Sequence, residues 1–203
     1  MEHGRYTAEM GERLEAWLKD QDQPDVKVYY DHGTGRMSKV VPYFGSYSRA
    51  STLAFVDCAV VDTSRRQTLV LCEIEEQGAS PKKVIGDIGN LLMAEWLCIG
   101  GQRYSFHSAH VILGICVKDG GQSEAKAKAI CRRLKSMAGP KMLRGLSIHV
   151  RAETDADVLV KTVQKEIEDV VRDASKRSVS TSSRRASPPR PCRPRTGSRR
   201  TRS

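Results

Sequence analysis

The sequence predicts a single α/β domain, with one mixed β-sheet flanked by helices, followed by a disordered basic tail. Two observations lead to this prediction. Apolar segments of strand-like composition alternate with segments in which apolar residues recur at helical spacing. Acidic residues also stop abruptly, because all 24 precede Lys176, whereas ten of the 34 lysines and arginines lie from that position onward. We therefore divide the chain into a domain, 1–175, and a tail, 176–203, rich in Arg, Ser and Pro.

The composition limits the class of protein. A chain of 203 residues is long enough to bury one core. It has no run of about 18 apolar residues, so we expect no membrane span, and its first residues lack the apolar core of a secretion signal. The five histidines show no metal-ligand spacing, and the six cysteines form no CxxC pair. Unpaired thiols are typical of a reducing compartment, so we expect a cytoplasmic protein.

The N-terminal part of the domain holds a helix and two strands. Apolar residues recur every three or four positions at 7–19, which predicts an amphipathic helix capped by Thr7. A strand is expected at 26–30. A further short strand is expected around 39–41, where Pro42 interrupts it.

A β-hairpin follows, with one apolar strand at 53–61 and the other at 68–75. The connection between them, 62–67, is polar and turn-forming. If the turn centres on Arg65, the two strands pair antiparallel and their register is fixed.

The C-terminal part alternates helices and strands. A helix is expected from Ser80, its cap, to about Leu97, with Pro81 in the first helical position. Gly86 and Gly89 of this helix would let it approach the sheet closely. The remaining elements are a strand at 109–117, a helix at 123–138, a strand at 146–150 and a capped helix at 155–173.

Three acidic side chains converge on one face of the predicted hairpin. In the expected register, Asp57 lies opposite Glu73 and diagonal to Glu75. Like charges at the roughly 5 Å separation of cross-strand neighbours are destabilising. An unpaired charge within an apolar strand is also costly, so Asp57 needs a partner. A divalent metal ion is the partner that suits three carboxylates.

Two lysines follow the acidic strand at the start of the next helix. Lys82 and Lys83 lie in its first turn, where the helix dipole disfavours cations. The connection 76–79 is short enough to bring this turn back beside Glu73 and Glu75. A lysine there would neutralise a carboxylate or activate a water molecule, whereas a solvated helix start is the alternative explanation.

The spacing of the acids resembles a known nuclease motif. Asp57, then fifteen residues, then Glu73-Ile-Glu75 resembles the motif of the PD-(D/E)xK nucleases, the restriction-endonuclease-like superfamily. The core of that family is a helix, a three-stranded meander, a helix and a strand, an order that resembles the one expected here from about 7 to 117. A glutamate of the first helix often joins the family's site, a position that Glu12 or Glu15 would fill.

The resemblance implies a role for each residue of the motif. Asp57 and Glu73 would be metal ligands, and Glu75 would stand in place of the usual lysine, as in the ExE variant of the family, and would also bind metal. Lys82 or Lys83 would then be the displaced catalytic lysine. The implied chemistry is hydrolysis assisted by Mg²⁺ or Mn²⁺, since hard oxygen ligands suit these ions better than zinc.

A loop before the hairpin mixes basic and aromatic residues. Arg36, Lys39 and Arg49 flank three aromatic residues between 43 and 47, a composition that suits phosphate contacts and base stacking. We therefore predict that these three basic residues bind nucleic acid, with the alternative that the aromatic side chains pack over the sheet.

Three functional interpretations follow from these features. The first is a Mg²⁺-dependent nuclease that hydrolyses phosphodiester bonds in DNA. The second is a catalytically inactive module of the same fold that binds nucleic acid or a protein partner, which the missing lysine at Glu75 favours. The third is an unrelated α/β domain whose acids bind a small cationic ligand. A separate alternative is that Glu73 and Glu75 end a strand and face water, while Asp57 makes a structural hydrogen bond. DNA is the expected partner, a homodimer is left open, and no membrane partner is expected.

Overall fold

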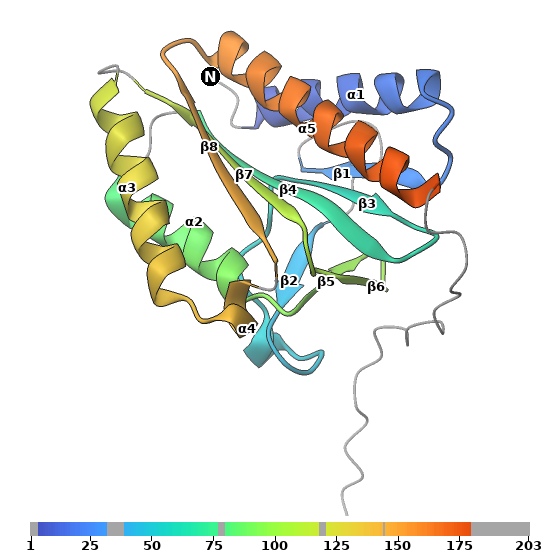
Figure 1. Ribbon diagram of the computed structural model, residues 1–203, viewed down its shortest axis with the longest axis horizontal. Helices are drawn as coiled ribbons and strands as arrows, with labels where there is room; N and C mark the ends of the chain where they lie inside the picture. Colours follow the sequence, from blue (N-terminus) through green and yellow to red (C-terminus); the bar gives the residue numbers. More distant parts are fainter. Residues whose placement is uncertain (1–3, 32–38, 77–79, 118–120, 144, 180–203) are drawn as a thin grey trace, which may run out of the picture.

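The structure is a computed structural model that describes residues 4–31, 39–76, 80–117, 121–143 and 145–179. These residues form one mixed eight-stranded sheet with helices on both faces, which is the α/β class that the sequence predicts (Figure 1). Within these ranges, no helix is long and apolar enough to cross a membrane. Residues 180–203 lie outside the described part of the chain. These residues make up most of the tail for which the sequence predicts disorder.

Five α-helices, one 3₁₀ turn and eight strands make up the described residues. The helices are α1 (Arg5–Asp20), α2 (Pro81–Met93), α3 (Gly121–Met137), α4 (Pro140–Leu143) and α5 (Ala156–Val179), and the 3₁₀ turn is η1 (Arg49–Ser51). The strands are β1 (Val26–Tyr30), β2 (Val41–Tyr43), β3 (Cys58–Asp62), β4 (Gln67–Glu75), β5 (Trp96–Ile99), β6 (Gln102–Ser105), β7 (His110–Cys116) and β8 (Ser147–Glu153).

The sheet combines antiparallel and parallel pairing. Strands β1, β3 and β4 pair antiparallel in that order, and β7 and β8 continue the sheet parallel to β4. Strands β2, β5 and β6 form a smaller antiparallel group, which joins β4 at the pair Gln67 and Ser105. The hydrogen-bonded centre of the sheet is therefore β3, β4 and β7.

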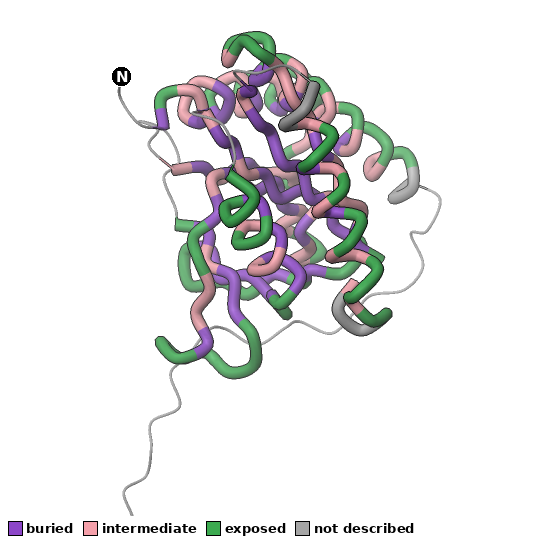
Figure 2. Tube along the Cα trace, turned by 90° about the vertical axis from the view of Figure 1, so that its left-hand side faces the viewer, coloured by how far each residue is buried: buried purple, intermediate pink, exposed green. Residues whose placement is uncertain are grey.

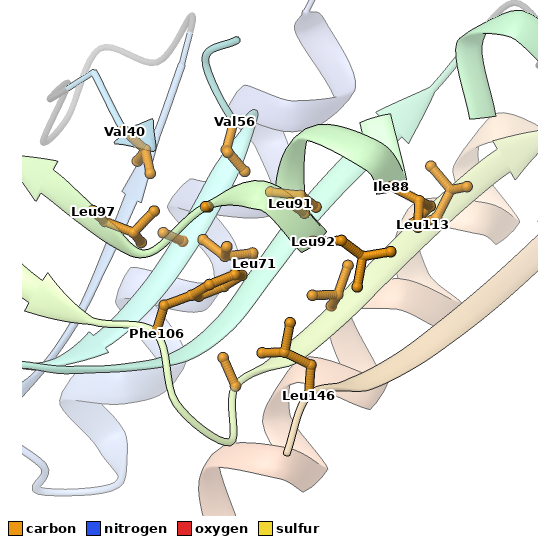
Figure 3. Packing of buried hydrophobic residues seen from close by; sticks show 14 of the residues in the cluster. Val40, Val56, Leu71, Ile88, Leu91, Leu92, Leu97, Phe106, Leu113 and Leu146 are labelled. Atoms are coloured by element: carbon orange, nitrogen blue, oxygen red, sulfur yellow. The ribbon is translucent and has the colours of Figure 1, made fainter. Parts of the chain in front are cut away.

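The sheet separates two apolar cores. Helices α1 and α5 cover one face, where Met10 and Tyr30 are buried. Helices α2 and α3 cover the other face, where Leu71 and Ile88 are buried (Figure 3). Successive residues of β4 alternate between the cores, since Cys72 belongs to the α1 and α5 side. Figure 2 shows the buried strands between more exposed helices.

The predicted caps of two helices are confirmed. Ser80 precedes α2, and its Oγ accepts a hydrogen bond from the Lys83 N–H at 3.2 Å. Asp155 precedes α5, and its Oδ1 accepts one from the Val158 N–H at 2.9 Å. Each side chain satisfies a backbone donor that the helix itself leaves free. Helix α5 continues to Val179, past the predicted domain boundary at 175.

Two boundaries in the N-terminal half differ from prediction. Thr7 is not the cap of α1, because the helix begins after Gly4, in the left-handed conformation with φ 85°, and Thr7 is buried within it. The strand predicted at 53–61 begins only at Cys58. Asp57 therefore directly precedes β3 instead of lying inside a strand.

The segment after α2 also differs from prediction. The helix expected to continue to about 97 ends at Met93, and the next residues form strands β5 and β6, which lie between β4 and β2 in the sheet. All four residues of β5 are buried, and an apolar run of this kind suits a strand and a buried helix equally well. Pro42 lies within β2, where it is tolerated because β2 ends the sheet.

The glycines predicted to bring α2 close to the sheet do not do so. A Cβ atom added to Gly86 or Gly89 would meet nothing within 4 Å. The close approach occurs on the other face, at Gly11 of α1, where an added Cβ would lie 2.2 Å from Cγ of Tyr30.

Candidate functional site

The three predicted acids lie where β3, β4 and the first turn of α2 meet. The β3–β4 register places Asp57, the residue before β3, across from Glu73. Leu71 packs in the core under α2, so strand alternation puts Glu73 and Glu75 on that same face. The cross-strand placement of the acids thus matches the one expected from the sequence.

Asp57 is held by the end of β4. Its Oδ2 accepts a hydrogen bond from the Ile74 N–H at 2.9 Å, and its side chain hydrogen-bonds that of Glu73. Burial, together with the negative charges of Asp57 and Asp87, raises the pKa of Glu73 well above its usual value. Two carboxyls this close favour sharing a proton, and a metal ion would displace that proton on binding.

Glu75 and Lys83 form an ion pair across the connection from β4 to α2. Glu75 is 6% exposed, whereas the Lys83 side chain is 54% exposed, so the carboxylate is the buried partner. Burial alone lowers the pKa of Lys83, but the hydrogen bond to Glu75 and its charge outweigh burial, and the pKa is raised. Lys82 is exposed on the same turn, so Lys83 is the lysine that the fold brings to the acids.

Asp87 is a fourth carboxylate, which the hairpin pattern in the sequence did not indicate. It lies four residues after Lys83 on α2, so the two side chains share a face of the helix. Burial, followed by the charge of Glu75 and a hydrogen bond with it, raises the pKa of Asp87 to about 6. Its Oδ2 is buried and has no hydrogen-bond partner among the described residues. The spacing from Lys83 was the available signal in the sequence.

The donor set suits Mg²⁺ or Mn²⁺. All four side chains offer hard oxygen atoms, and the group has four carboxyls but only the one paired lysine, Lys83, so a divalent cation would offset excess negative charge. Within the described ranges, no three Asp, Glu, His or Cys side chains already form a group that could hold a metal ion. Mg²⁺, however, commonly uses one or two protein carboxylates and keeps several waters. The Asp57–Glu73 pair meets that requirement, and Oδ2 of Asp87 is an unused acceptor nearby.

Glu15, one of the two candidate glutamates of the first helix, lies away from the acidic group. Helix α1 carries Glu12 and Glu15 and covers the opposite face of the sheet. Glu15 lines a hollow beside Val26, at the start of β1. Asp57 lies at the other end of that strand, where its carbonyl oxygen accepts from the Asp31 N–H at 3.0 Å. The structure therefore does not bring Glu15 to the acidic group.

Two of the three predicted nucleic-acid-binding residues are described. Lys39 Nζ lies 4.9 Å from the centre of the Phe55 ring, and Arg49 is exposed in η1. Arg36 lies outside the described residues. Both residues are exposed in the segment of the chain that precedes Asp57.

A second polar cluster, also missed, lies on the α5 face of the sheet. His110 Nδ1 and His149 Nε2 are 3.2 Å apart, and Glu166 Oε1 lies 3.0 Å from His149 Nδ1 and 2.6 Å from Arg151 Nη2. Burial alone raises the pKa of Glu166, but the hydrogen bond from His149 and the charge of Arg151 leave it below its usual value. The cluster borders a cavity of about 490 Å³. Only the parallel register of β7 and β8 brings the two histidines together.

Comparisons with protein-family models, with characterised proteins and with solved structures find no match to this chain. Function is therefore inferred from the side chains of the acidic group and from the order of the elements that hold them.

Proposed function

We propose that this protein is a Mg²⁺-dependent nuclease that hydrolyses phosphodiester bonds in DNA, with Mn²⁺ as a substitute ion. One observation carries the proposal. Lys83, on the helix that follows the acidic strand, reaches Glu75, on the same face of β4 as Glu73. An amine beside metal-binding carboxylates is the combination that the PD-(D/E)xK resemblance requires, supplied here by α2 and not by position 75.

The order of the described elements supports a restriction-endonuclease-like core. Helix α1 is followed by the antiparallel strands β1, β3 and β4, then by α2 and β7. This is the order helix, three-stranded meander, helix, strand. Strand β2 and the β5–β6 pair would be additions to that core.

Each side chain has its own role in the proposed reaction. Asp57 and Glu73 would hold the ion, which when bound lowers the pKa of a water molecule and stabilises the departing oxygen. The Lys83 ammonium, positioned by Glu75, would orient a phosphate oxygen and offset its negative charge. Asp87, whose pKa is about 6, would accept a proton from the attacking water near neutral pH.

The test is Mg²⁺-dependent cleavage of DNA by purified variants that remain folded by circular dichroism. We expect Asp57→Ala, Glu73→Ala and Lys83→Ala each to lower the cleavage rate by about 100-fold or more. Lys82→Ala is the matched control, because it removes an exposed lysine from the same turn, and it should cleave like the wild type. Equal cleavage by the wild type and the two acidic variants would falsify the proposal.

The alternative is a catalytically inactive module of the same fold that binds nucleic acid or a protein partner. The observation that favours it is that Glu75 already neutralises Lys83. Calorimetric titration with Mn²⁺ separates the two functions. A binding signal in the wild type that is lost in Glu73→Ala supports the nuclease, and no signal in either protein supports the inactive module.

A further inference from the structure

The segment 39–56 forms a two-stranded arm that leads to the acidic group. Its two sides are joined by backbone hydrogen bonds from the Val56 N–H to the Val40 carbonyl at 3.2 Å and from the Leu53 N–H to the Pro42 carbonyl at 2.9 Å. A further bond joins the Phe44 N–H to the Ser51 carbonyl near the tip, at 3.0 Å. The base of the arm is continuous with Asp57, and its tip extends beyond β2, away from α1 and α5 (Figure 1).

The arm exposes aromatic side chains along its length. Phe44 is 44% exposed, Tyr47 is 37% exposed and Phe55 is 53% exposed. The chain has three phenylalanines, and the third, Phe106, is fully buried. Burying a phenylalanine side chain stabilises a fold, and two of the three phenylalanines, both in this segment, remain partly exposed to water instead. Figure 2 shows the projecting tip as an exposed lobe.

The charge of the arm favours an anionic partner. Between 39 and 56 the sequence has two basic residues, Lys39 and Arg49, and no acidic one. Lys39 lies over the Phe55 ring at the base. Arg49 lines a hollow of about 380 Å³ at the tip together with Tyr43 and Tyr47. A basic side chain therefore lies near aromatic rings at each end of the arm, in contact with Phe55 at the base and beside the same hollow as Tyr43 and Tyr47 at the tip.

The tip is held in place by the smaller group of strands. Tyr43 stacks on Trp96 of β5, with ring centres 4.5 Å apart and planes 8° apart. The Arg103 guanidinium lies 4.5 Å from the centre of the Trp96 ring, and Trp96 Nε1–H donates to the Gly45 carbonyl at 2.9 Å. Tyr47 lies against Tyr43 with ring centres 5.2 Å apart. The exposed ring of Tyr47 is thus preorganised and requires little ordering on binding.

We propose that the arm binds a single-stranded segment of DNA and delivers it to the acidic group, with bases stacked on Phe55 and Tyr47 and phosphates beside Lys39 and Arg49. This inference rests on the proposed nuclease function for the choice of DNA. Bases within a duplex already stack on one another, so only an unpaired strand can present its base faces to these rings. A second copy of the arm would bring basic residues against basic residues, which disfavours self-association through this surface.

The test is binding by the full chain in EDTA, measured by fluorescence anisotropy with a 15-nucleotide oligo(dT), a duplex of equal length and an oligo(U) of equal length. We expect the wild type to bind oligo(dT) at least about tenfold more tightly than duplex, since each stacked base contributes roughly 5- to 150-fold. The double variant Phe55→Ala/Tyr47→Ala should lose most of that preference while its duplex affinity, which depends on charge, stays unchanged. Phe55→Trp should retain the preference, because it retains a stacking surface.

Met137→Ala is the matched control, because Met137 is 68% exposed on α3, outside the arm, and it should bind oligo(dT) like the wild type. Two binding results would overturn the inference: an unchanged oligo(dT) affinity in the double variant, or tighter binding of oligo(U) than of oligo(dT) by the wild type. A wild-type dimer that becomes a monomer in the double variant, with no change in DNA binding, would also overturn it. The measurement uses no metal and leaves the acids intact. The result of the binding measurement is therefore independent of whether the Asp57 and Glu73 variants lose cleavage.

Discussion

The acidic group has four carboxyls, those of Asp57, Glu73, Glu75 and Asp87, and one lysine, Lys83, which pairs with Glu75, so protons offset part of the negative charge. The pKa values of Glu73 and Asp87 are both raised, each first by burial and then by neighbouring carboxylates. In the unfolded chain these groups would have ordinary pKa values near 4. Ionising them at neutral pH therefore costs folding free energy, a cost that a bound divalent cation would remove.

Asp87→Asn should stabilise the metal-free protein at pH 8. The pKa of Asp87 is about 6 in the folded state and near 3.9 in the unfolded state, so its contribution to stability is fully present below pH 4 and is lost as pH rises through 6. An asparagine side chain does not ionise, so the variant does not lose stability in this way as the pH rises. We expect a gain of about 1–2 kcal/mol at pH 8, after allowing for solvent screening, that shrinks toward zero near pH 4.

Urea unfolding in EDTA at several pH values measures this difference, with Asp173→Asn, an exposed carboxylate on α5, as the control that should show no comparable trend. A gain that is equally large at pH 4 and pH 8 would contradict the electrostatic explanation.

At the scale of elements, local pattern predicted most of the central sheet, because β1, β4 and β7 carry apolar runs bounded by polar turns. The placement of Asp57 across from Glu73 agrees with a turn centred on Arg65, but the strands pair Asp62 with Gln67 beside the turn. A β-bulge between Val60 and Val61 then shifts the register by one residue and restores the predicted placement, which the local pattern did not indicate. Local pattern could not predict β5, whose four apolar residues fit either a strand or the end of a helix. It also could not place Asp87 beside Glu75 or His110 beside His149, because those contacts depend on how α2 packs and on parallel strand register.

Two glycine substitutions test the packing of the helices. Gly11→Ala should destabilise the protein by about 1–3 kcal/mol, because its Cβ would lie 2.2 Å from the Tyr30 ring and α1 would have to shift. Gly86→Ala, in a helix where an added Cβ meets nothing within 4 Å, should stabilise by about 0.5–1 kcal/mol, since alanine favours a helix over glycine. Chemical denaturation of both variants measures the difference. Stabilisation by Gly11→Ala would show that α1 does not pack on β1 in the described way.

At the scale of the whole molecule, the acidic group joins three elements that are otherwise held mainly by apolar contacts. Asp57 directly precedes β3, Glu73 and Glu75 belong to the end of β4, and Asp87 belongs to α2. A cation bound among these side chains would therefore stabilise the whole folded domain. A ligand that binds only the folded state raises the free energy of unfolding by about 2.7 kcal/mol when its free concentration is 100 times the dissociation constant. For a domain of this size, that corresponds to a rise of roughly 5–10 °C in Tm.

We accordingly expect Mn²⁺ or Mg²⁺ to raise the Tm of the wild type above its value in EDTA, with ionic strength matched by NaCl to remove general screening. Glu73→Gln keeps the shape of the side chain but removes one charged ligand, so it should raise the Tm of the metal-free protein slightly and abolish most of the metal-dependent rise. Lys82→Ala should keep the full rise, because Lys82 is exposed and apart from the Glu75–Lys83 pair. Differential scanning fluorimetry gives all three values, and an equal metal-dependent rise in the wild type and Glu73→Gln would place any bound ion away from the acidic group.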